Sequence, residues 1–425
     1  MQSNLPIPQN RLVLIGAIAL IAIGIFVAFS FFSAPATQNL PKITVWGTDS
    51  EAAIYSAVSE YNKKGMAVVS YKQIPAIGFE DKVRNALAAG EGPDIFYISN
   101  RDIRNLEASI TPLVSQTFNI GNFKALFPSV VETDLVKGGL IYALPLYIDT
   151  LAMVYNIKMF DSASIATPPK TWNELQEIVP RLRIINEKGQ LTRPGVGLGG
   201  SDKTVEHAAD LSFLLMLQNG ADVNRAGSDD VYFGESKKAQ DAINFYLQFS
   251  NPVSEYYAWN ETRKNSLDEF AAEELPVAFA YQSDFQRLKA KNQFINFGVA
   301  TMPQVSLQES VNYANYQGLA VAKQSRYKQL AWDFIIFTTT DTKATSDYFL
   351  SALHPPALRS LISLNSNDPK YSVFVSQALS AKSWVTKDYS WARDVIGETL
   401  AKIISGQINI SQGLKEAQSR INTKK

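Results

Sequence analysis

An unbroken apolar stretch stands near the start of the chain, ahead of every alternating pattern. Residues 12–32 read LVLIGAIALIAIGIFVAFSFF, and these 21 positions contain neither a charged residue nor a proline. As a helix rising about 1.5 Å per residue, the stretch would measure roughly 31 Å, which is about the thickness of a bilayer's hydrocarbon core. The pattern therefore predicts a transmembrane anchor over residues 12–33, between a short cytoplasmic tail (1–11) and a linker (34–41).

A cleaved signal peptide is the alternative explanation of this stretch. Ala34-Pro35-Ala36 has the small-x-small pattern of a cleavage site, although the apolar region of a signal peptide usually spans only about 7–15 residues. Arg11 is the nearest charge on the N-terminal side, so the positive-inside rule places the body outside. We expect a single-pass protein of the cell membrane with an extracytoplasmic body, and secretion after cleavage is the alternative.

Beyond Pro41 the pattern changes to short alternating strands separated by amphipathic helices. Apolar alternation predicts strands at 42–46, 66–74 and 94–99, and helical periodicity predicts helices at 51–64 and 80–89. This order is typical of a mostly parallel sheet with helices on its faces. Roughly 385 residues follow Pro41, which is more than one ordinary core holds and indicates two domains.

The remaining pattern continues in the same α/β style. The nearly continuous apolar stretch 139–155 is expected to hold two strands, and Thr171 with Glu174 predicts a capping box. Further elements follow from the periodicity: helices at 171–183, 208–219, 237–249 and 328–338, strands at 276–281, 297–302 and 318–322, and a mostly helical segment 371–425.

Composition removes several classes of function. Forty basic and forty acidic residues cancel, which gives no electrostatic case for nucleic-acid binding. The chain has no cysteine, so disulfides, thiolate metal sites and a lipid on an N-terminal cysteine are impossible, and an apolar helix is a reasonable substitute anchor. His207 and His354 lack ligand-like spacing. We expect no metal, no cofactor and no catalytic residues.

Several stretches, taken together, resemble one family. They are ITVWGTDSE, LAAGEGPDIFYISN, GGLIYALPLYIDTLAMVYNIKMF, PPKTWNEL, FAAEELPVAFAYQSDF, FGVATMP, YQGLAVAKQSRYKQLAWDFIIFTT and SGQINISQGLKEAQSRI. In this order they are similar to the extracellular solute-binding proteins of ABC transporters, in the maltose-binding-like family 1. The resemblance spans essentially the whole chain after Pro41, and it rests on collinearity rather than on any single stretch.

The resemblance implies a two-lobed, periplasmic-binding-protein-like (type II) α/β fold with discontinuous lobes and a hinge. Lobe one would comprise 42–143 with 316–350, and lobe two 144–315 with 351–425. The chain would cross between them near 144–148, 311–317 and 349–356. Closure of such lobes on a ligand is a hinge motion.

Polar residues at the ends of predicted strands are the first candidates for a binding site, because ligands of open α/β sheets bind beyond the carboxyl ends of strands. Thr48 and Asp49 follow the first strand, where Asp49 would bond a polar solute or simply cap the next helix. Ser99 and Asn100 follow the third strand and would either face the cleft or form a plain turn.

The other candidates combine the family positions with aromatic side chains, which can pack on the apolar faces of sugar rings. Asp149 lies in an apolar stretch, where a carboxylate must be satisfied; it would contact solute, as the family's acidic residue does here, or anchor the structure. Gln282 and Ser283 stand where many relatives carry an aromatic platform. The full set of further candidates is Tyr147, Asp149, Ser201, Asp202, Gln282, Ser283, Tyr316, Trp384, Trp391 and Arg393.

These observations predict a monomeric, membrane-anchored binding protein that captures a carbohydrate between two lobes and delivers it to an ABC transporter permease. Binding of a non-sugar solute, or a role as a sensor, is the alternative. A carbohydrate-active enzyme would need two opposed carboxylates at a set separation. The adjacent pairs Asp229-Asp230 and Glu273-Glu274 are better explained as solvated faces or helix starts, so we expect no enzyme.

Overall fold

The computed structural model describes residues 40–222, 224 and 228–424. The predicted tail and transmembrane anchor, and nearly all of the linker, lie outside these residues. Within them, no helix combines the length and the apolar character needed to cross a membrane. The fold described below is that of the compact unit that begins at Lys42.

The first of two hydrophobic cores surrounds a five-stranded sheet with the strand order β2-β1-β3-β14-β6. Strands β1 (Lys42–Gly47), β2 (Val68–Gln73) and β3 (Ile95–Ser99) run parallel to one another. Strand β14 (Gln317–Val321) runs antiparallel to both of its neighbours, β3 and β6 (Leu144–Pro145). All five residues of β3 are buried, as expected for a central strand covered on both faces. The predicted strands are confirmed, and the sheet is parallel only across its first three.

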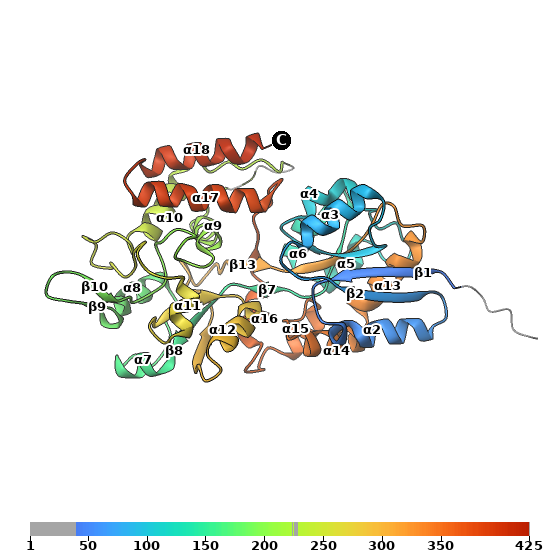
Figure 1. Cartoon of the computed structure of the whole chain (residues 1–425), viewed down its shortest axis with the longest axis horizontal. Helices are drawn as coiled ribbons and strands as arrows, with labels where there is room; N and C mark the ends of the chain where they lie inside the picture. Colours follow the sequence, from blue (N-terminus) through green and yellow to red (C-terminus); the bar gives the residue numbers. More distant parts are fainter. Residues whose placement is uncertain (1–39, 223, 225–227, 425) are drawn as a thin grey trace, which may run out of the picture. The chain divides into compact units, whose positions relative to one another are not determined.

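The second core surrounds an antiparallel sheet with the order β11-β8-β12. Its strands are β8 (Ala152–Asn156), β11 (Val277–Ala280) and β12 (Phe297–Ala300). Helix α9 (Ala208–Gln218) is buried from Ala208 through Met216, on every side, because it runs through the middle of this core. Figure 1 shows α9 beneath α17 and beside α10, away from the elements of the first sheet.

The remaining elements complete these two groups. The helices are α2 (Glu51–Lys63), α3 (Phe79–Ala89), α4 (Ile103–Leu106), η1 (Glu107–Ser109), α5 (Ile120–Leu126), α6 (Ser129–Leu135), α7 (Ile157–Ser162), α8 (Trp172–Leu182), α10 (Lys237–Leu247), α11 (Ser266–Ala271), η2 (Gln282–Asp284), α12 (Phe285–Lys291), α13 (Lys328–Thr340), α14 (Thr342–Ala352), α15 (Arg359–Leu364), α16 (Ser372–Ala378), α17 (Tyr389–Ile404) and α18 (Ile410–Thr423). The short strands are β4 (Val136–Lys137), β5 (Leu140–Ile141), β7 (Asp149–Thr150), β9 (Ile184–Ile185), β10 (Leu191–Arg193), β13 (Asn312–Asn315) and β15 (Ala381–Lys382).

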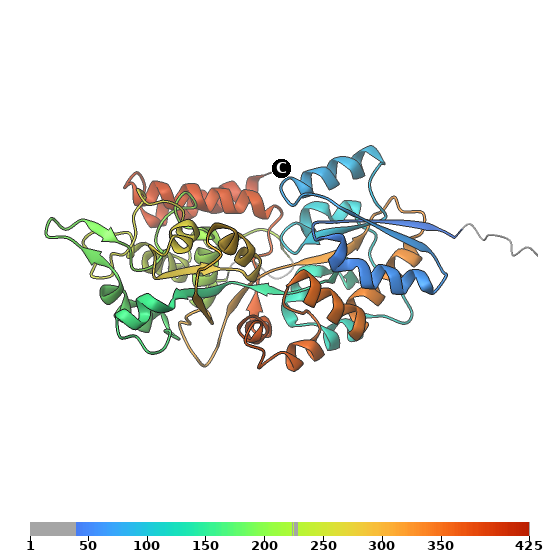
Figure 2. The same ribbon diagram turned by 60° about the horizontal axis from the view of Figure 1, so that its bottom comes forward.

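Three of the short strands carry the chain from one core to the other. Strands β7, β13 and β15 form one sheet, in which β13 pairs with both of its neighbours. Along the chain, the residues of the first core run up to Ile148 and then from Ala314 to Ala381. The residues between Ile148 and Ala314, and those after Ala381, belong to the second core. Figures 1 and 2 both show β7 and β13 running between the two groups of elements. The third passage thus lies at β15, whereas the sequence analysis expected it near 349–356.

Two local predictions differ from the structure. The stretch 139–155 contains four short strands instead of two, because the chain leaves the first core and enters the second within it. The Thr171 hydroxyl caps α8 by accepting from the amide of Glu174, but the Glu174 carboxylate accepts from the amide of Lys170 instead of closing the capping box on Thr171.

A buried carboxylate holds the end of β3 against the chain segment that enters β14. Asp134, which is 1 % exposed, accepts from Asn100 Nδ2 at 3.0 Å and from the Tyr316 hydroxyl at 2.7 Å. The Ser383 hydroxyl donates to its other oxygen. Burial raises the pKa of Asp134 to about 6, against the lowering effect of these three donors.

This raised pKa predicts how stability depends on pH. Folded Asp134 binds its proton more tightly than the unfolded residue does, so the free energy of unfolding should rise as the pH falls from about 7 to 5. A shift of about two pKa units corresponds to about 3 kcal/mol at most. Asp134→Asn keeps the shape, and the Tyr316 and Ser383 hydroxyls can turn to accept from the new amide. The variant should fold and show a flatter pH dependence in denaturant titrations. An unchanged slope between pH 7 and 5 would contradict the assignment.

Candidate functional site

A cavity of about 690 Å³ opens where residues on both sides of the crossing strands meet. From the first core's side it is lined by residues after β1, by Tyr147 and by the segment after α14. From the second core's side it is lined by the turn after β11 and the start of α12. Five of the sequence-predicted residues line it together, and they are Thr48, Asp49, Tyr147, Gln282 and Ser283.

Asp49 lines this cavity and does not cap the following helix. Ser50 is the N-cap residue of α2, and no described side chain caps this helix. The two carboxylate oxygens of Asp49 instead lie 2.5 Å from the Tyr348 hydroxyl and 3.2 Å from His354 Nε2. The ring of His354 stacks on that of Tyr147, with 4.0 Å between the ring centroids. Asp49 therefore combines ordered protein partners with a position on the cavity wall.

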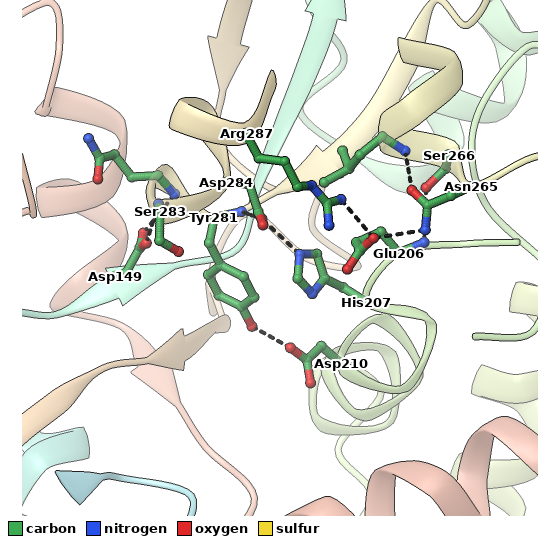
Figure 3. Close-up of polar contacts among 12 residues, drawn as sticks. Asp149, Glu206, His207, Asp210, Asn265, Ser266, Tyr281, Ser283, Asp284 and Arg287 are labelled. Atoms are coloured by element: carbon green, nitrogen blue, oxygen red, sulfur yellow. Dashed lines mark hydrogen bonds and ion pairs between the residues drawn. The ribbon is translucent and has the colours of Figure 1, made fainter. Parts of the chain in front are cut away.

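Asp149, in β7, anchors the second core's side of the cavity. Its carboxylate is 1 % exposed and accepts from three backbone amides, those of Thr150 at 2.9 Å, Gln282 at 3.1 Å and Ser283 at 3.0 Å. Figure 3 shows Asp149 directed at the turn that holds Ser283. Burial raises its pKa to about 6, and the amides oppose that rise. These contacts match the expectation that Asp149 anchors the structure. A role of Asp149 in binding solute stays a prediction.

Three predicted residues at the ends of the first sheet's strands have partners inside the protein. The side chains of Asn100 and Tyr316 both donate to Asp134, and the side-chain oxygen Oδ1 of Asn100 accepts from the backbone amide of Tyr316. The Ser99 hydroxyl oxygen accepts from the amide of Arg101 at 3.2 Å. The structure thus joins these residues to one another instead of to the lining of the cavity beside Asp49.

Ser201 and Asp202 line a different cavity, of about 830 Å³, beside α17. The Ser201 hydroxyl and amide both donate to Glu261, at 2.7 Å each. One Asp202 oxygen accepts from the amide of Ala209, and the other lies next to Gly397. A side chain at Gly397 would collide with that oxygen, because a Cβ atom there would lie 2.5 Å from it.

The predicted residues near the C-terminus pack within the second core or on its surface. Trp384 is 3 % exposed and stacks on Phe213, with 3.8 Å between ring centroids. The Trp391 indole donates to the backbone oxygen of Arg420 at 3.0 Å. Arg393 pairs with Asp394 at 3.0 Å on the surface. None of the three lines the cavity beside Asp49.

Two candidate functional residues, Arg101 and Asp210, were not predicted from the sequence, and both are charged. Arg101 pairs with the buried Asp210 of α9 at 2.6 Å, and Tyr281 donates to the same carboxylate oxygen at 2.7 Å. A signal was available: Asp210 is the one charged residue in the α9 sequence AADLSFLLMLQ, and a carboxylate in such a helix needs a partner. Arg101 directly follows the predicted pair Ser99-Asn100.

A histidine–aspartate pair fixes the orientation of Tyr281. Asp284 accepts from the Tyr281 amide at 2.9 Å and lies 2.8 Å from His207 Nε2 (Figure 3). Burial alone would lower the pKa of His207, but the neighbouring Asp284 raises it on balance. Burial likewise acts to raise the pKa of Asp284, and His207 lowers it on balance. The two groups thus stabilise each other in their charged forms.

The comparisons with known proteins agree with this architecture. The sequence profile described as "Bacterial extracellular solute-binding protein" matches residues 46–345. The maltotriose-binding protein of Pyrococcus abyssi is 23 % identical over 349 residues, which cover 77 % of this chain and 68 % of that protein.

Solved structures share the fold at low identity. A cyclo/maltodextrin-binding protein complexed with maltotetraose superposes with a TM-score of 0.72 at 19 % identity, covering 91 % of this chain and 97 % of the other. CpMnBP1 with mannotriose bound gives a TM-score of 0.68 at 19 % identity, covering 90 % and 100 %. The fold is therefore the two-lobed, mixed α/β fold of maltose-binding-like proteins, and the matched proteins are binding proteins, not enzymes. The chain belongs to the bacterial extracellular solute-binding protein family.

Proposed function

We propose that this protein captures a carbohydrate in the cavity beside Asp49 and delivers it to an ABC transporter permease. The observation that carries the proposal is the cavity itself, because its walls come from both cores and hold polar groups on each side. A volume of about 690 Å³ lies within the range of about 300–1,000 Å³ that is usual for small-molecule sites. The sugars named for the related maltotriose- and maltotetraose-binding proteins support this solute class.

The chemistry of the cavity wall suits a sugar. Each sugar hydroxyl can both donate and accept a hydrogen bond. The wall offers the carboxylate of Asp49, the hydroxyls of Thr48 and Ser283 and the side-chain amide of Gln282. The stacked rings of Tyr147 and His354 add apolar surface next to these groups. We therefore assign solute contact to these residues, and contact by the other predicted residues stays a prediction.

Closure of the two lobes on the solute would be a hinge motion about the three crossing strands. The sequence predicts one lobe of 42–143 with 316–350 and another of 144–315 with 351–425. Packing favours placing residues 351–381 with lobe one, since Leu358, Leu361 and Tyr371 belong to the first core. The proposal keeps a monomer with two lobes and moves the third hinge segment to β15.

A membrane tether completes the proposal. The apolar length of residues 12–33 supports a single-pass anchor, which would hold the body on the extracytoplasmic side next to the permease. Such an anchor would substitute for a lipid on an N-terminal cysteine, because the chain has none.

Calorimetric titration of the full-length protein tests the solute class. The panel should contain malto- and manno-oligosaccharides, monosaccharides, mannitol and neutral amino acids. We expect at least one carbohydrate to bind. Asp49→Asn should weaken that binding by roughly 10- to 100-fold, because a hydrogen bond to a charged group contributes about 1.5–3 kcal/mol.

The matched control is Asp241→Asn, which alters an exposed carboxylate on α10, away from the cavity lining. This variant should bind as the wild type does. Binding confined to non-carbohydrates, or sugar binding that Asp49→Asn leaves intact, would refute the solute class or the assigned site respectively.

Membrane fractionation tests the tether. Full-length protein should stay in the membrane pellet after alkaline carbonate extraction, and a truncated chain starting at Lys42 should be soluble, because it lacks the roughly 31 Å apolar helix. Release of the full-length protein, with a mass that fits cleavage after Ala36, would show the signal-peptide alternative instead.

A further inference from the structure

The guanidinium group of Arg101 crosses from one core into an aromatic cage on the other. Arg101 follows β3 in the first core, whereas the cage residues Tyr281, Tyr313 and Tyr389 all belong to the second. The Arg101 Cζ atom lies 4.3 Å from the ring centroid of Tyr389, 5.6 Å from that of Tyr281 and 5.9 Å from that of Tyr313. These distances fall within the range of about 6 Å at which a cation is attracted to an aromatic ring.

Asp210 supplies the negative charge of the cage. Its side chain is 3 % exposed and that of Arg101 is 16 % exposed, with 2.6 Å between Arg101 Nη2 and Asp210 Oδ2. The hydroxyls of Tyr281 and Tyr389 donate to the same carboxylate, one to each oxygen. Burial works to lower the pKa of Arg101, and Asp210 raises it on balance, so Arg101 stays charged.

The ion pair between Arg101 and Asp210 is buried, but Arg101 leaves some of its hydrogen-bond donors unused. A contact that opens when the lobes move can leave donors unused in this way. The Nε–H of Arg101 is buried and has no hydrogen-bond partner among the described residues. The Nη2 group of Arg101 donates to both Asp210 and the Tyr281 hydroxyl, so the guanidinium group does not use all of its donors. Breaking the pair would nevertheless strand a buried carboxylate, which is costly.

The cage adjoins the proposed solute site through a single residue. Tyr281 directly precedes Gln282 and Ser283, whose side of the cavity is held by Asp149. Figure 3 shows Tyr281 directed at Asp210. Ser283, which is on the same turn as Tyr281, lies beside Asp149 of β7. A change at the cage would therefore reach the cavity wall through this turn.

Another set of ion pairs also joins the two cores, but it is more open to water. Asp229, which precedes Val231 of the second core, pairs with Arg104 at 3.3 Å and with Lys137 at 3.1 Å. Its side chain is 22 % exposed, compared with 3 % for Asp210. Solvent weakens such pairs, so the caged pair is the stronger connection of the two.

We propose that the tyrosine–aspartate cage is a guanidinium receptor and that Arg101 is its built-in ligand, which latches the two lobes together. The latch sets the balance between closed and open protein, so a solute meets a receptor whose opening must first release Arg101. This role does not depend on which solute binds.

Distance measurements on the solute-free, full-length protein test the latch. Because the chain has no cysteine, spin labels can be attached at Tyr55→Cys on α2 and Val253→Cys after α10. These side chains are 70 % and 90 % exposed, so the labels should disturb little. Pulsed electron resonance then reports the distance between the lobes.

Arg101→Ala should shift the distances to longer values. Loss of a buried ion pair should lower the closed-to-open ratio on the order of tenfold or more. Millimolar methylguanidinium should bind the emptied cage, and urea at the same concentration should not, but neither should restore the wild-type distances, because a free ligand does not tie the cage to the first lobe. Arg101→Lys should give an intermediate result, because lysine keeps the charge and loses the planar group.

Arg420→Ala is the matched control. Arg420 also pairs with a carboxylate, Glu398 at 2.7 Å, and lies over the ring of Trp391 at 5.3 Å, but all three belong to the second core's helices α17 and α18. This variant should keep the wild-type distances. If Arg101→Ala fails to fold, Arg101→Lys decides. A folded Arg101 variant with unchanged distances overturns the latch, and because no sugar is present this result leaves the carbohydrate proposal untouched.

Discussion

The need to hydrogen-bond three strands that leave one hydrophobic core for another is the constraint on which this structure depends. A chain that crosses between cores carries backbone amides and carbonyls away from both sheets, and those groups must find partners. Strands β7, β13 and β15 solve this by pairing with one another. Their sheet sets the positions of Tyr147 just before β7 and of Asp149 within it, so the cavity wall is built on the crossing itself.

Three buried aspartates near this crossing differ in the groups that satisfy them. Asp149 is held by backbone amides, which fixes a turn. Asp134 is held by side-chain hydroxyl and amide groups that join β3 to the start of β14. Asp210 is held by two tyrosines and by an arginine from the other core. Asp149 takes its donors from one side of the crossing, whereas Asp134, through Ser383 after β15, and Asp210, through Arg101, each bond a group from the other side, which ties them to the relative position of the lobes.

Much of the fold could be predicted because it follows from local patterns. Alternation and helical periodicity located β1, β2, β3, α9 and α13 to within a few residues. The site was harder. Strand-end reasoning found Thr48 and Asp49, and it also proposed Asn100, whose side chain bonds Asp134. It overlooked Arg101, because its partners lie more than a hundred positions away at Asp210 and beyond.

By itself, the sequence determined the two-lobed α/β fold, the family and the apolar length of residues 12–32, because each follows from composition, periodicity or collinear similarity. Only the tertiary structure decided which polar residues share a cavity, where the chain crosses for the third time and which lobe satisfies Asp210. The physical reason is that the stabilisation of a buried charge does not depend on how far apart the charge and its donor lie in the sequence. It is stabilised by whatever donor the packed chain brings within about 3 Å, and no local pattern records that donor.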